Sequence, residues 1–139
     1  MKSRILPLLL AVVFFSCKKE IGPADIAKIN GYWEIEKVIL PNGETKEYPV
    51  NTTIDYFEIK GTSGLRKKVT PQLDGTYIDN GPAENIMVSF TDGNAYLHYN
   101  SGYAQWKEKV IAANDNELVF INSNKLEYHY KKPIPFSKK

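Results

Sequence analysis

The chain has 139 residues, 42% of them hydrophobic and 24% charged, which is the composition of one compact globular domain. Its 18 lysines and arginines against 16 aspartates and glutamates leave a formal charge of only +2. A single cysteine excludes an internal disulfide framework and any metal site built from several thiolates. The 12% of aromatic residues favours β-structure.

The first residues have the pattern of an export signal. Lys2 and Arg4 precede an apolar run from Ile5 to Phe15, broken only by Pro7. A membrane-spanning helix needs roughly 20 apolar residues, so this run is too short to remain as one. The pattern predicts a signal peptide over residues 1–16.

The segment Phe14-Phe15-Ser16-Cys17 resembles a bacterial lipobox, although Phe14 stands where Leu is usual. The resemblance implies cleavage before Cys17, diacylation of its thiol, a lipidated tether over 17–28 and an outer-membrane lipoprotein facing the periplasm or the cell surface. Membrane lipid is then a partner through Cys17. The alternative is an ordinary signal peptide with an incidental cysteine. Cleavage removes Lys2 and Arg4, so 18 − 2 = 16 cations remain against 16 carboxylates, which excludes a nucleic-acid footprint.

Beyond a short helical turn predicted at 24–29, the pattern is that of short strands. Residues 32–40 alternate, with Trp33, Ile35 and Ile39 on one face and Glu34 and Glu36 on the other. Further strands are predicted at 53–60, 65–73, 76–79, 86–91, 95–100, 103–113, 117–123 and 126–132. Gly and Asn recur between them, as tight hairpins require.

Short turns favour pairing of strands in sequence order. The fold class is therefore all-β: a single up-and-down meander of about eight strands. Such a meander closes into a barrel or stays a curved open sheet. We expect closure, because no helix is available to cover a face.

The residues Ile29-Asn30-Gly31-Tyr32-Trp33 resemble the Gly-x-Trp opening of lipocalin-type barrels, as found in small lipocalin-like domains on lipoproteins of Gram-negative bacteria. The resemblance implies a barrel over 29–132, in which Gly31 is structural and Trp33 plugs one end. Many lipocalins place an arginine over this tryptophan, and Lys131 or Lys132 stands in its place in this chain. The remainder, 133–139, is a basic C-terminal tail. The family also suggests binding of a small apolar molecule.

Five aromatic side chains fall on alternating positions of the C-terminal strands and are the candidate ligand-binding residues: Tyr99, Trp106, Phe120, Tyr128 and Tyr130. Such rings either wall a cavity or fill the barrel. Glu108 shares a face with Trp106 and Val110. If that face is inward, burial would raise the pKa of Glu108; otherwise Glu108 lies outside or at a rim.

No catalytic or metal site stands out. By alternation, His98 and His129 are expected to point outward, and a metal site needs three or four converging donors. The carboxylate pairs Glu34 with Glu36 and Glu108 with Glu117 are the candidates for acid–base chemistry, but an outer strand face explains the first pair better. We expect no enzyme, no cofactor and no metal.

Two functions remain open. The first is a binding module that holds a small apolar or amphipathic ligand inside the barrel. The second is a non-catalytic subunit with a filled barrel whose outer surface docks an envelope protein.

Overall fold

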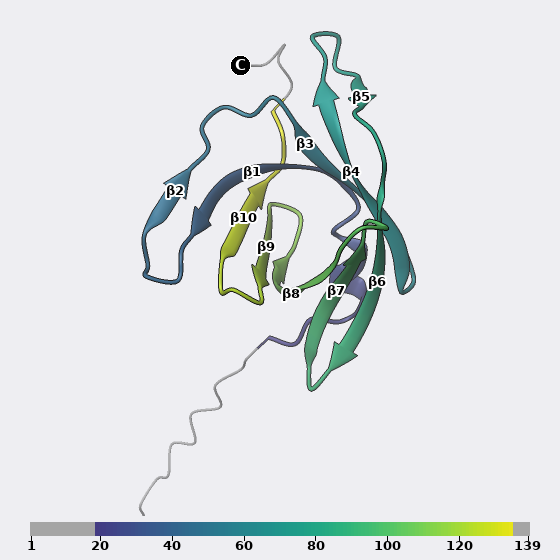
Figure 1. The fold of residues 1–139 in the computed structure, drawn as a ribbon, viewed down its shortest axis with the longest axis vertical. Coiled ribbons are helices and arrows are strands. Elements are labelled where there is room, and N and C mark those ends of the chain that lie inside the picture. Colours follow the sequence, from purple (N-terminus) through teal and green to yellow (C-terminus); the bar gives the residue numbers. More distant parts are fainter. Residues whose placement is uncertain (1–18, 135–139) are drawn as a thin grey trace, which may run out of the picture.

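The computed structural model describes residues 19–134, and they form one antiparallel sheet closed on itself (Figure 1). The sheet has ten strands, eight of which form a barrel: β1 (Gly31–Ile39), β3 (Ile54–Lys60), β4 (Ser63–Pro71), β6 (Glu84–Thr91), β7 (Asn94–Asn100), β8 (Gln105–Ala113), β9 (Glu117–Asn122) and β10 (Glu127–Lys131). The other two, β2 (Thr45–Glu47) and β5 (Tyr77–Asp79), extend hairpins beyond it. A short helix, α1 (Pro23–Ala27), precedes the strands.

Closure comes from the pairing of the last strand with the first. Ile35 of β1 lies opposite Tyr130 of β10, so neither strand is left as an exposed edge there. The predicted all-β meander barrel is therefore confirmed. The strand β2 was not predicted; its three residues are all exposed. The strand β4 begins at Ser63, earlier than predicted, because Gly61 at φ +63° allows a two-residue turn that pairs Lys60 with Ser63.

The register of β1 changes within the strand. A bulge between Ile35 and Lys37, opposite β10, shifts the alternation by one residue. Val38 is consequently buried, whereas the sequence pattern placed Ile39 with Trp33 and Ile35. The prediction that Glu34 is exposed on the outer face was also wrong, because a loop and the end of the described chain cover it.

One end of the barrel is closed by Trp33 and α1. The Trp33 side chain is fully buried, and its Nε1 donates a hydrogen bond to the Ile29 carbonyl at 2.7 Å. The side chain of Asn30 bonds both backbone groups of Ile59 and so joins the segment after α1 to the end of β3. The Lys132 Nζ lies 3.9 Å from the centre of the Trp33 ring, so of the two lysines that the sequence offered for this place, Lys132 covers the ring.

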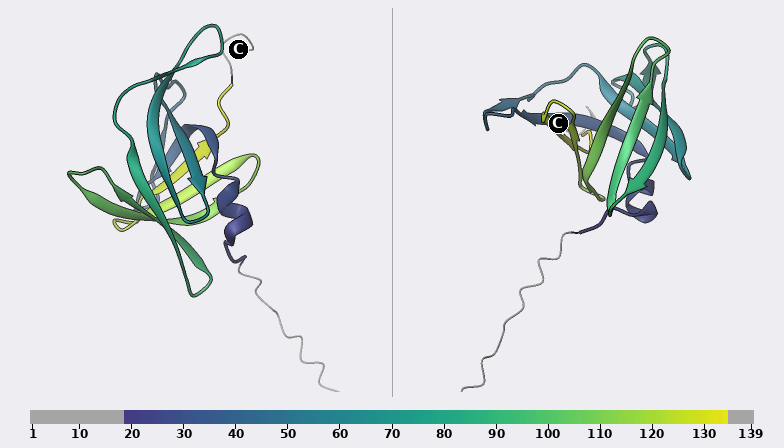
Figure 2. Two further views of the ribbon diagram at one scale, coloured as in Figure 1. Left: turned by 90° about the vertical axis from the view of Figure 1, so that its right-hand side faces the viewer. Right: turned by 60° about the horizontal axis from the view of Figure 1, so that its bottom comes forward.

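The closed half of the barrel is filled with apolar side chains. The core includes Ile26, Ile29, Trp33, Phe57, Ile59, Ile86, Val88, Leu97, Tyr99, Val110, Leu118 and Phe120. Figure 2 shows α1 at this end and the β4–β5 hairpin at the other. Over residues 19–134, no helix has the length and apolarity needed to cross a lipid bilayer.

Candidate functional site

The open half of the barrel contains two hollows that share the side chains of Lys68, Tyr128 and Tyr130. The first, of about 310 Å³, is lined by Ile35, Val38, Tyr48, Asn51, Thr53, Ile54, Asp55, Lys68, Tyr128 and Tyr130. The second, of about 230 Å³, is lined by Arg66, Lys68, Trp106, Glu108, Asn122, Tyr128 and Tyr130. The hollows are therefore neighbours at the open end, or mouth, of the barrel, above the filled core.

The strand pattern explains why this space lies where it does. The first part of β1 pairs with β3, whereas its last residues pair with β2. In the same way, β4 pairs with β6 near its start and with β5 near its end. Beyond these points the barrel strands separate, and the segment between β2 and β3 lines the first hollow with Tyr48 and Asn51.

The structure brings all five predicted aromatic residues onto the inner side of the barrel, in two groups. Tyr99 and Phe120 are buried in the core below the hollows. Trp106, Tyr128 and Tyr130 line the hollows themselves. The rings are in mutual contact: Tyr99 stacks on Trp106 with centres 5.3 Å apart, and Phe120 meets Tyr130 edge-on at 5.8 Å.

A cluster of charged side chains also lies inside the barrel, centred on Arg66. The Arg66 side chain is 11% exposed, and one of its Nη atoms donates to Glu84 Oε2 at 2.5 Å. The other Nη lies 3.7 Å from Glu108 Oε1. The guanidinium also lies over the Tyr99 ring, 4.4 Å from its centre. Because β4, β6, β7 and β8 are consecutive around the barrel, inward residues of four strands meet at this point.

A second ion pair lies beside this cluster. The Lys68 ammonium contacts the Asp55 carboxylate, which is 4% exposed. The two residues face each other directly across the β3–β4 pairing. Asp55, Arg66 and Lys68 were not predicted as site residues. The alternation of Asp55 with Phe57 and Ile59 could have placed Asp55 inside, whereas nothing in the sequence of β4 marks its charged face as the inner one.

Glu108 lies on the inner face, as one of the two predicted alternatives had it. It is 5% exposed, and burial raises its pKa above the ordinary value. The Tyr99 hydroxyl and the Arg66 guanidinium oppose that rise, and the carboxylates of Asp55 and Glu84 add to it. Glu108 is therefore a carboxylate whose surroundings disfavour its charge.

A pH dependence of stability follows from this shift. Because the pKa of Glu108 is higher in the folded than in the unfolded chain, its ionised form lowers stability above that pKa, and protonation removes this cost as the pH falls. Glu108→Gln is expected to raise the free energy of unfolding at about pH 7, with the gain shrinking toward about pH 4. Urea unfolding at both pH values measures the difference from the unaltered chain.

Glu36→Gln is the matched control, since Glu36 is a glutamate exposed on the strand β1. It is expected to show no such pH-dependent gain. If instead Glu108→Gln is the less stable protein at neutral pH and the two converge in acid, Arg66 stabilises the carboxylate and the expected sign is wrong.

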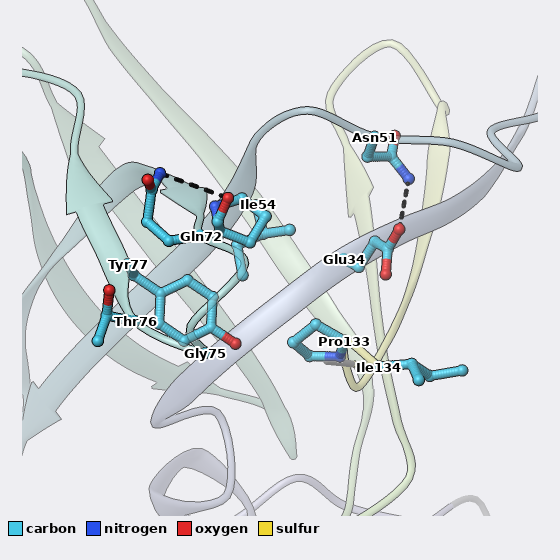
Figure 3. Close-up of a pocket in the computed structure, with 10 residues that line it drawn as sticks. Glu34, Asn51, Ile54, Gln72, Gly75, Thr76, Tyr77, Pro133 and Ile134 are labelled. Carbon is cyan, nitrogen blue, oxygen red and sulfur yellow. Dashed lines mark hydrogen bonds between the residues drawn. The ribbon is translucent and has the colours of Figure 1, made fainter. Parts of the chain in front are cut away.

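A small pocket lies outside the barrel, around Glu34 (Figure 3). Asn51 Nδ2 donates to Glu34 Oε1 at 3.1 Å, and Tyr77 and Pro133 are among the other lining residues. Its volume is about 30 Å³, far below the roughly 300–1,000 Å³ typical of ligand sites. We therefore place the candidate site inside the barrel.

The other predicted polar residues do not assemble into a site. His98 is exposed, and His129 is half-buried with its Nε2 2.7 Å from Glu127 Oε1. Glu117 is exposed at the turn between β8 and β9, at the far end of β9 from the residue that pairs with Glu108. Within residues 19–134, no three His, Cys, Asp or Glu side chains are grouped to hold a metal ion.

The chain is similar to known proteins. A family model described as a lipocalin-like domain matches residues 29–120. The crystal structure of a lipocalin-like protein from Bacteroides uniformis ATCC 8492 is similar with a TM-score of 0.47 and 11% identity, over 76% of this chain and 99% of that one. The crystal structure of an uncharacterized protein from Bacteroides eggerthii DSM 20697 is similar with a TM-score of 0.46 and 14% identity, over 75% of this chain and 98% of that one. No curated protein matches the chain.

Proposed function

Because this chain belongs to the lipocalin-like domain family, we propose that its barrel binds one small amphipathic molecule in the hollows at the open end. The observation that carries the proposal is the pair of neighbouring hollows, of about 310 and 230 Å³, above a closed and filled lower half. The larger hollow alone is within the usual size range of ligand sites.

The lining supports an amphipathic rather than a purely apolar ligand. Ile35, Val38 and Ile54 give apolar surface in the first hollow, whereas Arg66 and Glu108 give charged groups in the second. Ligand sites typically combine apolar and aromatic walls with a few polar groups that fix orientation.

The test is purification of the full chain from its native envelope without denaturation, followed by mass spectrometry of any co-purifying small molecules. We expect a bound molecule that quenches the fluorescence of Trp106. Tyr128→Ala is expected to weaken this quenching, because Tyr128 lines both hollows. The control is Tyr103→Ala, whose ring is fully exposed. If the preparation is empty and fatty acids, sterols and haem-like molecules do not quench the fluorescence, the alternative function is favoured: a subunit with a filled barrel that docks an envelope protein.

We also propose that the protein is anchored through a lipid on Cys17, which lies outside the described residues. The lipobox-like segment supports this. The described chain begins near the closed end, where the Ile21 amide bonds the Gly93 carbonyl of the β6–β7 turn. A lipid on Cys17 would therefore hold the closed end toward the membrane and leave the mouth facing away.

Metabolic labelling with a palmitate analogue tests the anchor. The unaltered chain is expected to be labelled and to fractionate with membranes, and Cys17→Ser is expected to lose both properties. A variant that keeps its label and its membrane association would show that Cys17 is an incidental cysteine.

A further inference from the structure

The charged groups inside the barrel do not balance. Three carboxylates, Asp55, Glu84 and Glu108, are in contact with two cations, Arg66 and Lys68. Lys68 forms an ion pair with Asp55, and Arg66 donates a hydrogen bond to Glu84. Glu108 is therefore the carboxylate without a cation of its own. Its contact with Arg66, at 3.7 Å, is too long for a hydrogen bond.

One oxygen of the Glu108 carboxylate also lacks a hydrogen-bond donor. Among the described residues, its Oε1 has no hydrogen-bond partner, although only 5% of the residue is exposed, and the Tyr99 hydroxyl, whose influence lowers the pKa of Glu108, has none either. A buried charge without a donor is costly, and native structures seldom leave one unexplained. Because Glu108 lines the second hollow, a positively charged ligand there can pair with its carboxylate.

The walls around Glu108 favour a positive donor. Trp106, Tyr128 and Tyr130 line the same hollow, and the faces of aromatic rings attract cations. A carboxylate ligand would find a less suitable site, because Arg66 and Lys68 already hold carboxylates of the protein. Arg66 contacts Glu84 and Lys68 contacts Asp55, so their charges are already paired within the protein.

We propose that the second hollow receives the charged nitrogen of an organic amine, with Glu108 as its counter-ion and Trp106 and Tyr128 as its aromatic walls. The apolar part of the amine then lies in the first hollow against Ile35 and Val38, because the two hollows adjoin at Tyr128. This inference rests on the proposed function and names the chemical class of the ligand.

The test compares three probes that share one alkyl chain: octylamine, octanol and octanoate. Isothermal titration of the purified full chain near neutral pH is expected to show octylamine binding at least about tenfold more tightly than octanol, with octanoate weakest, since a hydrogen bond to a charged group is worth about 1.5–3 kcal/mol. Glu108→Gln keeps the shape of the side chain and removes its charge. It is expected to abolish the preference for octylamine over octanol.

Glu36→Gln, on the exposed side of β1, is the matched control and is expected to keep the preference. If octanol or octanoate binds as tightly as octylamine, or if Glu108→Gln keeps the preference, the amine assignment is wrong while binding in the barrel stands. If none of the three probes binds, the amine assignment is also overturned. The proposed function is tested separately, by the mass spectrometry of molecules that co-purify with the chain from its native envelope.

Discussion

Trp33→Ala is expected to lower the free energy of unfolding by about 3–5 kcal/mol, the cost of removing a large buried aromatic side chain. Trp33 is fully buried at the closed end, where it holds the Ile29 carbonyl through Nε1 and receives Lys132 on its ring. Its loss would leave a cavity between α1 and the barrel and an unpaired carbonyl. Urea unfolding followed by far-ultraviolet circular dichroism measures the change.

Two further variants separate the contribution of the Trp33 hydrogen bond to the free energy of unfolding from that of its buried ring. Trp33→Phe keeps most of the ring and removes the hydrogen bond to Ile29, so we expect a smaller loss, of about 1–3 kcal/mol. Trp106→Ala removes a half-buried ring from the open half and is expected to cost less than Trp33→Ala. A loss below about 1 kcal/mol for Trp33→Ala would show that Trp33 does not close the barrel.

Arg66→Met is expected to have a comparable effect, about 3–5 kcal/mol at neutral pH, because it removes the cation from a buried cluster and leaves the carboxylates behind. Arg66 is the neighbour of both Glu84 and Glu108, and its side chain is only 11% exposed. The methionine retains much of the volume, so the loss reports charge rather than packing. Urea unfolding at several pH values measures it.

The loss of unfolding free energy in Arg66→Met should become smaller as the pH falls, because protonated carboxyl groups are uncharged and are not stabilised by a neighbouring cation. The double variant Arg66→Met/Glu108→Gln should recover part of the stability at neutral pH for the same reason. Lys67→Met is the control: Lys67 is the next residue on β4, its ion pair with Asp79 lies on the outside, and little change is expected. A loss for Arg66→Met that is independent of pH would contradict the electrostatic account.

Local signals in the sequence were sufficient for most of the fold. Turns such as Asp92-Gly93 adopt the positive φ values that Gly and Asp tolerate, so their positions marked the ends of strands. Alternation over β7 and β10 put Tyr99 and Tyr130 on the buried face. These features depend on residues adjacent in the chain, which is why they were predictable.

Features that depend on pairing between distant strands were not predictable in this way. The bulge in β1 arises against β10, and it moved the buried position from Ile39 to Val38. Glu34 is buried because Asn51 and Pro133 come to lie over the outside of β1. Alternation describes two faces of one strand and contains no information about what later covers them.

The sequence by itself determined an all-β meander, the tryptophan of its first strand and the aromatic face of its last strands, because period-two patterns and turn residues act locally. Only the tertiary structure decided that the barrel closes, which end is open and that its interior is partly ionic. Arg66 on an isolated strand is simply a charged residue. As an inner residue it lies in a site where water is scarce, and there Glu84, from the neighbouring strand β6, pairs with its charge.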